Sequence, residues 1–456
     1  MDCPLLQEGG WFMGAGTALS KLCAKVGKPL SGVGLEAGVL LGQQRQAGDC
    51  AASSSGRAML LADQQSSPLV NPLRGAKPGN PGLGALGTDA ALALATDSPN
   101  PMELPMTLAA QHPSPLAETE LAQIWFTRCP VPTASGIAYK LGWLSAEFAA
   151  DGLPVSTLQE ARQLGRHHYD HQLPGLFREG GNVPALAARA AGAPSRLIGL
   201  TWIEEWQTIL VRPDSAIRSA HDLKGKRLAL PAWGDSRPGS IARAMSLHGY
   251  KGALSLAGLG FDDVELVEVA LQDQEQAANP QEGLQRLWSG LDYLVRGEVD
   301  AVYVKGASAA DAARRLGLVV GIDLDQITDP RYRINNGTPR PITVHQSLLD
   351  NHFELVVRFL AQTLSAADWA ADNREALHAI LAEETRADSA GVAEAYRGDF
   401  HTTLAPDLSA QRLEFLEIQK NFLYLHGFLE GDFDIADWVD PRPLQAAHEL
   451  LAKRRA

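Results

Sequence analysis

Cysteine is scarce in this sequence. The four cysteines are Cys3, Cys23, Cys50 and Cys129, and no two of them have the Cys-x-x-Cys spacing of a zinc ribbon or a redox pair. This pattern argues against a disulfide framework and against a zinc site. We therefore expect a reducing, cytoplasmic setting and a protein that holds no metal.

An excess of positive charge is also missing. The 456 residues include 40 Lys and Arg against 53 Asp and Glu, which gives a formal net charge of -13. A nucleic-acid-binding protein needs a basic surface to neutralise phosphates, and adsorption to anionic membranes needs the same. We therefore expect neither partner.

Long apolar runs are absent as well. The longest candidates are Leu30–Gly42, which Glu36 interrupts, and Leu83–Ala95, which Asp89 interrupts. Both fall short of the about 20 apolar residues that a membrane span needs. Met1–Gly10 has no basic residue ahead of an apolar run and does not resemble a secretory signal. We expect no insertion into a membrane.

Residues 1–120 differ in composition from the rest of the chain. They are rich in Gly, Ala, Ser and Pro, as in Asn71-Pro72 and Ser98-Pro99-Asn100-Pro101, and have few aromatic residues. Neither a helical nor a strand period is sustained in this part. This composition predicts a disordered or low-complexity extension.

From Gln123 the pattern becomes a regular alternation of strands and helices. The expected strands are Gln123–Thr127, Pro154–Leu158, Arg196–Trp202, Thr208–Arg212, Val264–Val269, Ala301–Val304 and Leu318–Asp323. The helices expected between them include Thr133–Ala150, Asn182–Ala191, Ser240–His248 and Leu284–Arg296. After Thr343 the pattern is mostly helical.

This alternation predicts an α/β protein with mainly parallel sheets and a helical C-terminal tail. Two strand–helix blocks predict two lobes, with the tail packing back on the first. Residues 121–215 plus 345–456 would form the first lobe, and residues 216–344 the second. A single large α/β domain is the alternative. Ligands of open α/β sheets bind at the carboxyl ends of the strands, so the site is expected there.

Cys129 follows the first expected strand and precedes a helix, in Thr127-Arg128-Cys129-Pro130. A thiol at a helix start lies where the helix dipole and free N–H groups favour an anion, and this stabilises the reactive thiolate. The alternative is a buried structural cysteine, which is a common fate of a lone thiol.

Three histidines lie within five residues, in His167-His168-Tyr169-Asp170-His171. His167 and His171 have the i, i+4 spacing of metal ligands on a helix. No glutamate lies between them as in zinc proteases, and no third ligand is evident, so we expect no metal here. Asp170 is placed to orient a neighbouring imidazole instead.

The segment Arg178-Glu179-Gly180-Gly181 precedes a helix that opens with Asn182-Val183-Pro184. A guanidinium can hold two anionic oxygens, and glycines let backbone N–H groups approach a ligand at a helix N-terminus. The alternative is a surface turn with a solvated arginine. The sequence contains neither a phosphate-binding P-loop nor a Gly-x-Ser-x-Gly nucleophile elbow.

Taken together, these motifs resemble the 2'-hydroxybiphenyl-2-sulfinate desulfinase family. The resemblance covers roughly residues 124–447. It is carried by Cys129-Pro130-Val131-Pro132, His168, Arg178, Gly180-Gly181 and Pro184, and continues through Asp222-Leu223-Lys224-Gly225-Lys226-Arg227 and Gly398-Asp399-Phe400. Residues 237–261, which should help to line the aryl pocket, depart from the family pattern.

The resemblance implies a two-lobed fold of the type-2 periplasmic solute-binding proteins, such as those for nitrate, sulfonates and taurine. It implies cleavage of a carbon–sulfur bond without a cofactor, releasing sulfite. The catalytic residues would be Cys129, His168 and Arg178, with Gly180, Gly181 and Tyr169 joining Arg178 in binding the substrate. Cys129 would either protonate the ring carbon or attack sulfur, and His168 would set the protonation of the thiol or activate water.

A second function fits the same fold. The protein would then be the substrate-binding component of an ABC transporter for a sulfonate, nitrate or related anion, with no chemistry of its own. A reactive thiol and the absence of a recognisable signal favour the enzyme. In either case the partner would be a small aryl sulfinate or sulfonate, and we expect a monomer.

Overall fold

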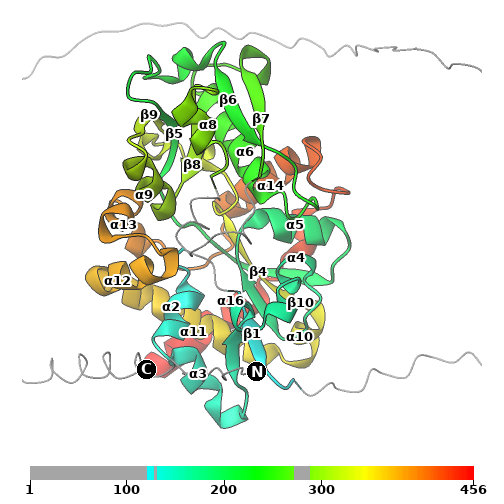
Figure 1. The fold of residues 1–456 in the computed structure, drawn as a ribbon. Helices are drawn as coiled ribbons and strands as arrows, with labels where there is room; N and C mark the ends of the chain where they lie inside the picture. The colour runs from blue at the N-terminus through cyan, green and yellow to red at the C-terminus, as the bar shows by residue number, and fades with distance from the viewer. Residues whose placement is uncertain (1–120, 128–130, 272–287) are drawn as a thin grey trace, which may run out of the picture. The chain divides into compact units, whose positions relative to one another are not determined.

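The computed structural model describes residues 121–127, 131–271 and 288–456 (Figure 1). The predicted extension, residues 1–120, lies outside the described residues, so its disorder stays a prediction. The described residues all belong to one unit of the chain, Pro105–Ala456. Among the helices described, none is long and apolar enough to cross a membrane.

The first group of strands forms a five-stranded sheet in the order β2-β1-β3-β10-β4. The strands are β1 (Ile124–Phe126), β2 (Val155–Thr157), β3 (Leu176–Glu179), β4 (Ser195–Thr201) and β10 (Arg340–His345). β1 runs parallel to β2 and β3, whereas β10 runs antiparallel to β3 and β4. Every residue of β3 is buried.

The second group contains β5 (Gln207–Val211), β6 (Arg227–Pro231), β7 (Glu265–Val269), β8 (Val302–Lys305) and β9 (Val319–Asp323). β5 lies between β8 and β9 and is antiparallel to both, while β6 and β7 pair in parallel. A bridge between Leu228 and Ala301 joins the two sheets. The helices α6 (Ile241–Ser255), α8 (Leu291–Arg296) and α9 (Ala307–Arg315) belong to this group.

The predicted α/β class is therefore confirmed, but the sheets are mixed rather than mainly parallel. The reason lies in the chain path. After the second group of strands the chain returns to the first sheet as β10, which inserts between β3 and β4 in the opposite direction. Strand pairing places β5 in the second group and β10 in the first group, whereas the predicted boundaries assign β5 to the first lobe and most of β10 to the second. The lobe boundaries at 215/216 and 344/345 stay a proposal.

Glycine breaks one predicted helix. Thr133–Ala150 was expected to be continuous, but the structure has α2 (Ala134–Lys140) and α3 (Trp143–Phe148). Gly142 lies between them at φ 76°, a left-handed conformation that glycine adopts without steric cost. Thr133 caps α2, because its side chain accepts a hydrogen bond from the Gly136 N–H. The start of α2 is thereby fixed immediately after the segment that holds Cys129.

The C-terminal part is helical, as predicted, once β10 is complete. It comprises α10 (Gln346–Asn351), α11 (Phe353–Asp372), α12 (Arg374–Thr385), α13 (Ser389–Ala395), α14 (Ala410–Leu425), α15 (Ile435–Trp438) and α16 (Arg442–Arg455). Isolated bridges from Val439 and Asp407 to β4 hold this part against the first sheet. The prediction that the tail packs back on the first group of strands is consistent with these bridges. α13 also packs against α9 of the second group.

Candidate active site

A cavity of about 930 Å³ lies between the two groups of strands. Its lining residues follow the carboxyl ends of strands: Val131 comes after β1, Gly181 after β3, Trp233 after β6 and Leu271 after β7, and Lys305 ends β8. The cavity therefore lies at the carboxyl ends of the strands, where the sequence analysis expected the site.

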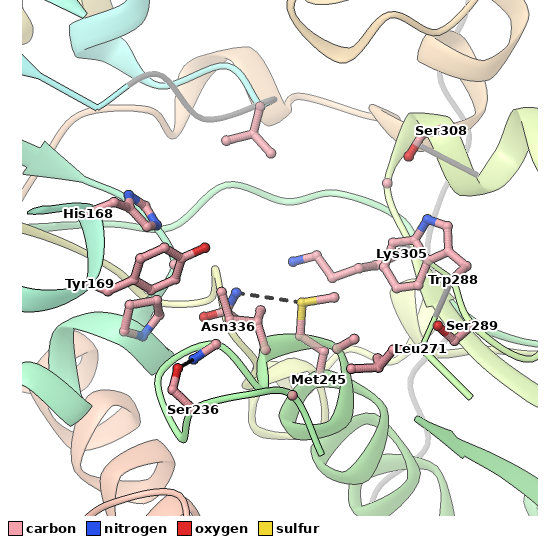
Figure 2. A pocket seen from close by; sticks show the side chains of 18 of the residues that line it. His168, Tyr169, Ser236, Met245, Leu271, Trp288, Ser289, Lys305, Ser308 and Asn336 are labelled. Atoms are coloured by element: carbon pink, nitrogen blue, oxygen red, sulfur yellow. Dashed lines mark hydrogen bonds between the residues drawn. The ribbon is translucent and has the colours of Figure 1, made fainter. Parts of the chain in front are cut away.

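Both groups of strands contribute to the lining, and Figure 2 shows His168 and Tyr169 on the side of the cavity opposite Trp288, Ser289 and Leu271. The first wall consists of His168, Tyr169, Gly181 and Pro184, which belong to the first group of strands or its helices. The second wall consists of Trp233, Met245, Leu271, Trp288 and Ser289, from the second group. Lys305 extends into the space between them.

Arg178 lies directly behind the first wall. It is on strand β3 and is 0% exposed, so the alternative of a solvated surface arginine is wrong. Its Nε donates to the His168 carbonyl at 3.0 Å, and its Nη2 donates to the Gly181 carbonyl at 2.9 Å. The guanidinium therefore fixes two residues that line the cavity, in addition to supplying positive charge.

His168 is held as a neutral ring. Burial and the positive charge of Arg178 place the pKa of His168 well below its ordinary value of 6.5. The Nη2 of Arg178 is 3.3 Å from His168 Nε2 and can only donate, so Nε2 accepts and the ring proton is on Nδ1. At neutral pH this imidazole can accept or relay a proton but carries no charge.

Both glycines of the Arg178 segment are required by close packing. A Cβ on Gly180 would lie 3.0 Å from the Arg178 guanidinium carbon, and one on Gly181 would lie 2.5 Å from the side-chain amide of Asn336. That amide caps helix α5 (Asn182–Ala190), because its Oδ1 accepts from the Val183 N–H at 2.9 Å. The Gly181 N–H has no acceptor among the described residues, so it is the donor at this helix start that a ligand can use.

The other histidines contact neighbouring protein groups. His167 Nδ1 lies 2.8 Å from Asp170 Oδ1, so Asp170 orients an imidazole, as predicted, but that of His167. His171 is buried and interacts with the Tyr169 carbonyl at 3.4 Å. Tyr169 is partly exposed at the cavity and packs edge-on against His168. Within the described part of the chain, no three His, Cys, Asp or Glu side chains gather as metal ligands do.

Cys129 lies outside the described residues. The described residues on either side of its segment are Thr127 and Val131. The Thr127 hydroxyl donates to the Glu179 carbonyl at 2.9 Å, beside Arg178, and Val131 lines the cavity. The proposed role of Cys129 stays a prediction from the sequence.

A charged cluster of Glu205, Lys305 and Arg340 borders the same cavity. Lys305 Nζ is 2.5 Å from Glu205 Oε1, and Arg340 Nη2 is 4.0 Å from the same oxygen. All three side chains are buried. Gly337 packs against both cations, since a Cβ there would lie 2.6 Å from Arg340 Nη2 and 3.2 Å from Lys305 Nζ.

Among the described residues, the buried charges around the cavity leave one positive charge. The cations are Arg178, Lys305 and Arg340, and the carboxylates are Glu205 and Glu179. Burial raises the pKa of Glu179, but the Ser135 and Thr201 hydroxyls donate to its oxygens at 2.5 and 3.0 Å and favour the ionised form. Asp235, the remaining charged residue of the lining, is exposed and screened by solvent. The balance suits a single monovalent anion.

Sequence reasoning did not identify the second wall or the charged cluster. Trp233 packs against Phe428 in a tilted arrangement with ring centroids 4.6 Å apart, and the Arg243 guanidinium lies 5.1 Å from the Trp233 ring centroid. For Lys305 the available signal was position, because it directly follows the predicted strand Ala301–Val304. Glu205 and Arg340 do not directly follow the end of a predicted strand, so their positions in the sequence did not indicate a role in the site.

Comparison with known proteins shows which families the chain is similar to. The family described as NMT1/THI5 like matches residues 182–280. The 2'-hydroxybiphenyl-2-sulfinate desulfinase of Rhodococcus erythropolis is 27% identical over 372 residues, which cover 74% of this chain and 97% of that enzyme. The resemblance inferred from the motifs is thus confirmed.

Solved structures show the fold. The desulfurization enzyme DszB superposes with a TM-score of 0.59 at 24% identity, covering 72% of this chain and 99% of that one. The periplasmic aliphatic sulphonate binding protein SsuA from Escherichia coli superposes with a TM-score of 0.51 at 17% identity, covering 70% and 92%. The chain is therefore similar to 2'-hydroxybiphenyl-2-sulfinate desulfinase along nearly all of that enzyme, and it has the two-lobed fold of the type-2 periplasmic solute-binding proteins.

Proposed function

We propose that this protein is a desulfinase that hydrolyses an aryl sulfinate. In this reaction the sulfinate anion and water give the arene and bisulfite, as the carbon–sulfur bond breaks and a proton takes the place of sulfur on the ring. The similarity to the Rhodococcus desulfinase supports the reaction class. The substrate of that relative, a hydroxybiphenyl sulfinate, has the features that the cavity suits.

The observation that carries the proposal is the pairing of one surplus positive charge with an aromatic wall. The charge lies behind His168 and Gly181, Trp288 lies across the cavity from His168 (Figure 2), and Trp233 also lines the cavity. A monoanion attached to an aromatic ring satisfies both surfaces. A small inorganic anion would leave the second wall without a partner, and an uncharged arene would leave the charge uncompensated.

The residues of the first wall then have distinct roles. The Gly181 N–H donates to a sulfinate oxygen, and Arg178 supplies the compensating charge and keeps Gly181 and His168 in place. Gly180 has no side chain and so leaves room for the Arg178 guanidinium, and Tyr169 contacts the aromatic ring of the substrate at the edge of the cavity. Cys129 provides the reactive sulfur, either as proton donor to the ring carbon or as nucleophile towards sulfur.

His168 acts in its neutral form under this proposal. The charge of Arg178 opposes formation of an imidazolium, so the ring is poorly suited to storing a proton between steps. With Nε2 accepting from Arg178, the Nδ1–H is available to orient the thiol or the attacking water. No metal or organic cofactor is needed for these steps.

A binding protein for a sulfonate is the second candidate, and the fold shared with SsuA favours it. Charge compensation and an aromatic wall suffice for binding without chemistry. The proposed cytoplasmic location and monomeric state belong to the enzyme hypothesis and stay predictions.

Sulfite release decides between the two functions. The purified protein is incubated with 2'-hydroxybiphenyl-2-sulfinate, and sulfite and the arene are quantified in parallel. Equal amounts of both products, formed catalytically, are expected. Binding of the sulfinate by calorimetry with no sulfite released would instead support the binding protein.

A further inference from the structure

Lys305 is a buried cation that points into the cavity. It is the last residue of β8, in the second group of strands, and it lines the cavity although it is only 7% exposed. Figure 2 shows its side chain extending into the space between Trp288 and Tyr169. Arg178, by contrast, is 0% exposed and is not a lining residue. A ligand in the cavity can therefore touch the Lys305 ammonium, whereas the Arg178 guanidinium acts from behind the first wall.

The surroundings of this ammonium hold it in place. Its Nζ is 2.5 Å from Glu205 Oε1, and Arg340 Nη2 is 4.0 Å from the same oxygen. Two glycines make room for the pair, since a Cβ on Gly306 would lie 2.9 Å from Glu205 Oε2 and one on Gly337 would lie 3.2 Å from Lys305 Nζ. Lys305 therefore has a defined position rather than the freedom of a surface lysine.

Glu205 does not use all the donors of Lys305. An ammonium carries three N–H groups, and the ion pair with Glu205 is its one charged contact within the described residues. The same carboxylate also faces Arg340, so it does not compensate both cations. A buried cation with donors to spare favours an anion whose oxygens can accept from it.

The ammonium also lies close to the donor of the first wall. Gly337, against which Lys305 Nζ packs, directly follows Asn336, and the Asn336 amide packs against Gly181 and caps α5. Figure 2 shows Lys305 pointing toward the side of the cavity where Asn336 lies. Lys305 thus approaches the start of α5 from the second group of strands, while the Gly181 N–H belongs to the first. A sulfinate has two oxygens and can accept from both.

We infer that Lys305 binds the substrate anion directly, with its ammonium donating to one sulfinate oxygen while the Gly181 N–H donates to the other. The inference rests on the proposed function, which places the sulfinate at the first wall. It assigns the direct cationic contact to Lys305 and leaves Arg178 the positioning role described above. The bound anion is then held from both groups of strands.

The test separates direct contact from charge balance. Each variant is made in the full chain carrying Cys129→Ser, so that no ligand is consumed, and is titrated calorimetrically with 2'-hydroxybiphenyl-2-sulfinate and with methanesulfinate. Lys305→Met should weaken binding of both sulfinates by about 10- to 100-fold, the effect of one charged hydrogen bond. Lys305→Met combined with Glu205→Gln removes one charge of each sign. It should bind as weakly as Lys305→Met alone, because the net charge is kept but the donor is lost.

Lys251→Met is the matched control, because it makes the same substitution at an exposed lysine outside the cavity lining. It should leave both affinities unchanged. Thermal unfolding of each variant shows whether it is folded, and the double variant keeps the test decisive if Lys305→Met, which leaves Glu205 without its nearest cation, is not. Affinities in the double variant equal to those of the parent chain would overturn the direct contact alone, because Lys305 would then only balance Glu205. Binding of neither sulfinate by the parent chain would overturn the proposed function, and the inference with it.

Discussion

The two walls of the cavity are built on different principles. The first wall is fixed by hydrogen bonds, since the buried Arg178 guanidinium bonds the carbonyls of His168 and Gly181 and Asn336 caps the adjoining helix. The second wall is built from large side chains in packing contact, such as Trp233 against Phe428, with few polar contacts. The same fold thus presents a positively charged, hydrogen-bonded surface on one side and an apolar surface on the other.

This difference suggests how a solute-binding fold can host chemistry. Substitutions in the first wall alter charges and hydrogen bonds that depend on one another, so a single substitution there affects several contacts. Substitutions in the second wall alter the area of contact with the ligand and leave the anion site intact. We therefore expect substitutions in the first wall to abolish or strongly weaken function, and those in the second to shift preference among ligands.

The largest loss of activity is expected on substitution of Cys129, which the proposed function assigns to the first wall. Cys129→Ser nearly keeps the shape but replaces the thiol with a much weaker acid and nucleophile. Sulfite release should fall by several orders of magnitude, while affinity for the sulfinate by calorimetry should change little. Cys50→Ser makes the same chemical change elsewhere and should leave turnover intact. Undiminished sulfite release by Cys129→Ser would remove this residue from the mechanism.

The next effect is expected at Arg178. Lysine keeps the charge but cannot donate from the positions of Nε and Nη2 at once, so the His168 and Gly181 carbonyls lose their donors. Arg178→Lys should weaken sulfinate binding by about 1.5–3 kcal/mol, the scale of hydrogen bonds to charged groups. Isothermal titration calorimetry measures the loss.

Arg296→Lys supplies the control for that experiment. Arg296 forms surface ion pairs with Asp292 and Glu298 and is remote from the cavity lining. Its replacement should leave sulfinate affinity unchanged. An Arg178→Lys variant that is folded and binds as tightly as the wild type would show that the charge alone suffices.

Acid should destabilise the first wall through His171. Burial and the charge of Arg178 lower the pKa of His171 from 6.5 to about 3. Above pH 6.5 neither the folded nor the unfolded state binds this proton. Between about pH 6.5 and 3 only the unfolded state binds it, so the free energy of unfolding falls by up to about 1.4 kcal/mol per pH unit as the pH falls.

His171→Asn should remove this dependence. Asparagine tolerates the left-handed conformation of this position, where φ is 56°. Urea unfolding at pH 5 and pH 7 should show a smaller pH dependence for the variant than for the wild type. His221→Asn, at an exposed histidine, should behave like the wild type. Equal pH dependence in all three proteins would mean that His171 is not buried as a neutral ring.

The sequence predicted which residues of the first wall lie together better than it predicted the strands that carry them. His168, Arg178 and Gly181 do meet at the cavity. However, β3, which carries Arg178, was not predicted, because a four-residue strand ending in Arg and Glu shows no apolar alternation. β10 was also missed, and only long-range pairing with β3 and β4 makes it a strand.

The second wall was harder to predict for a physical reason. Its residues are brought together by the convergence of β6, β7 and β8, not by proximity in the chain. The charged cluster has the same origin, since Glu205 precedes β5 and Arg340 begins β10. No local pattern distinguishes a buried Glu205–Lys305 pair from two solvated charges, so this contact depends on the tertiary structure.

The smallest effect is expected at Trp233, and it tests whether the second wall recognises the ring. Removing its indole by Trp233→Ala should weaken binding of an aryl sulfinate by about 0.5–1.5 kcal/mol, the contribution of one aromatic contact. Methanesulfinate, which has no ring, should bind the variant and the wild type equally, because the first wall is unchanged. Tyr424→Ala removes an aromatic side chain that is also 44% exposed but lies outside the cavity lining, and it should affect neither ligand. If Trp233→Ala weakened both sulfinates to the same degree, the two walls would not act separately, and Trp233 would instead contribute to the position of the anion site through its contact with Phe428.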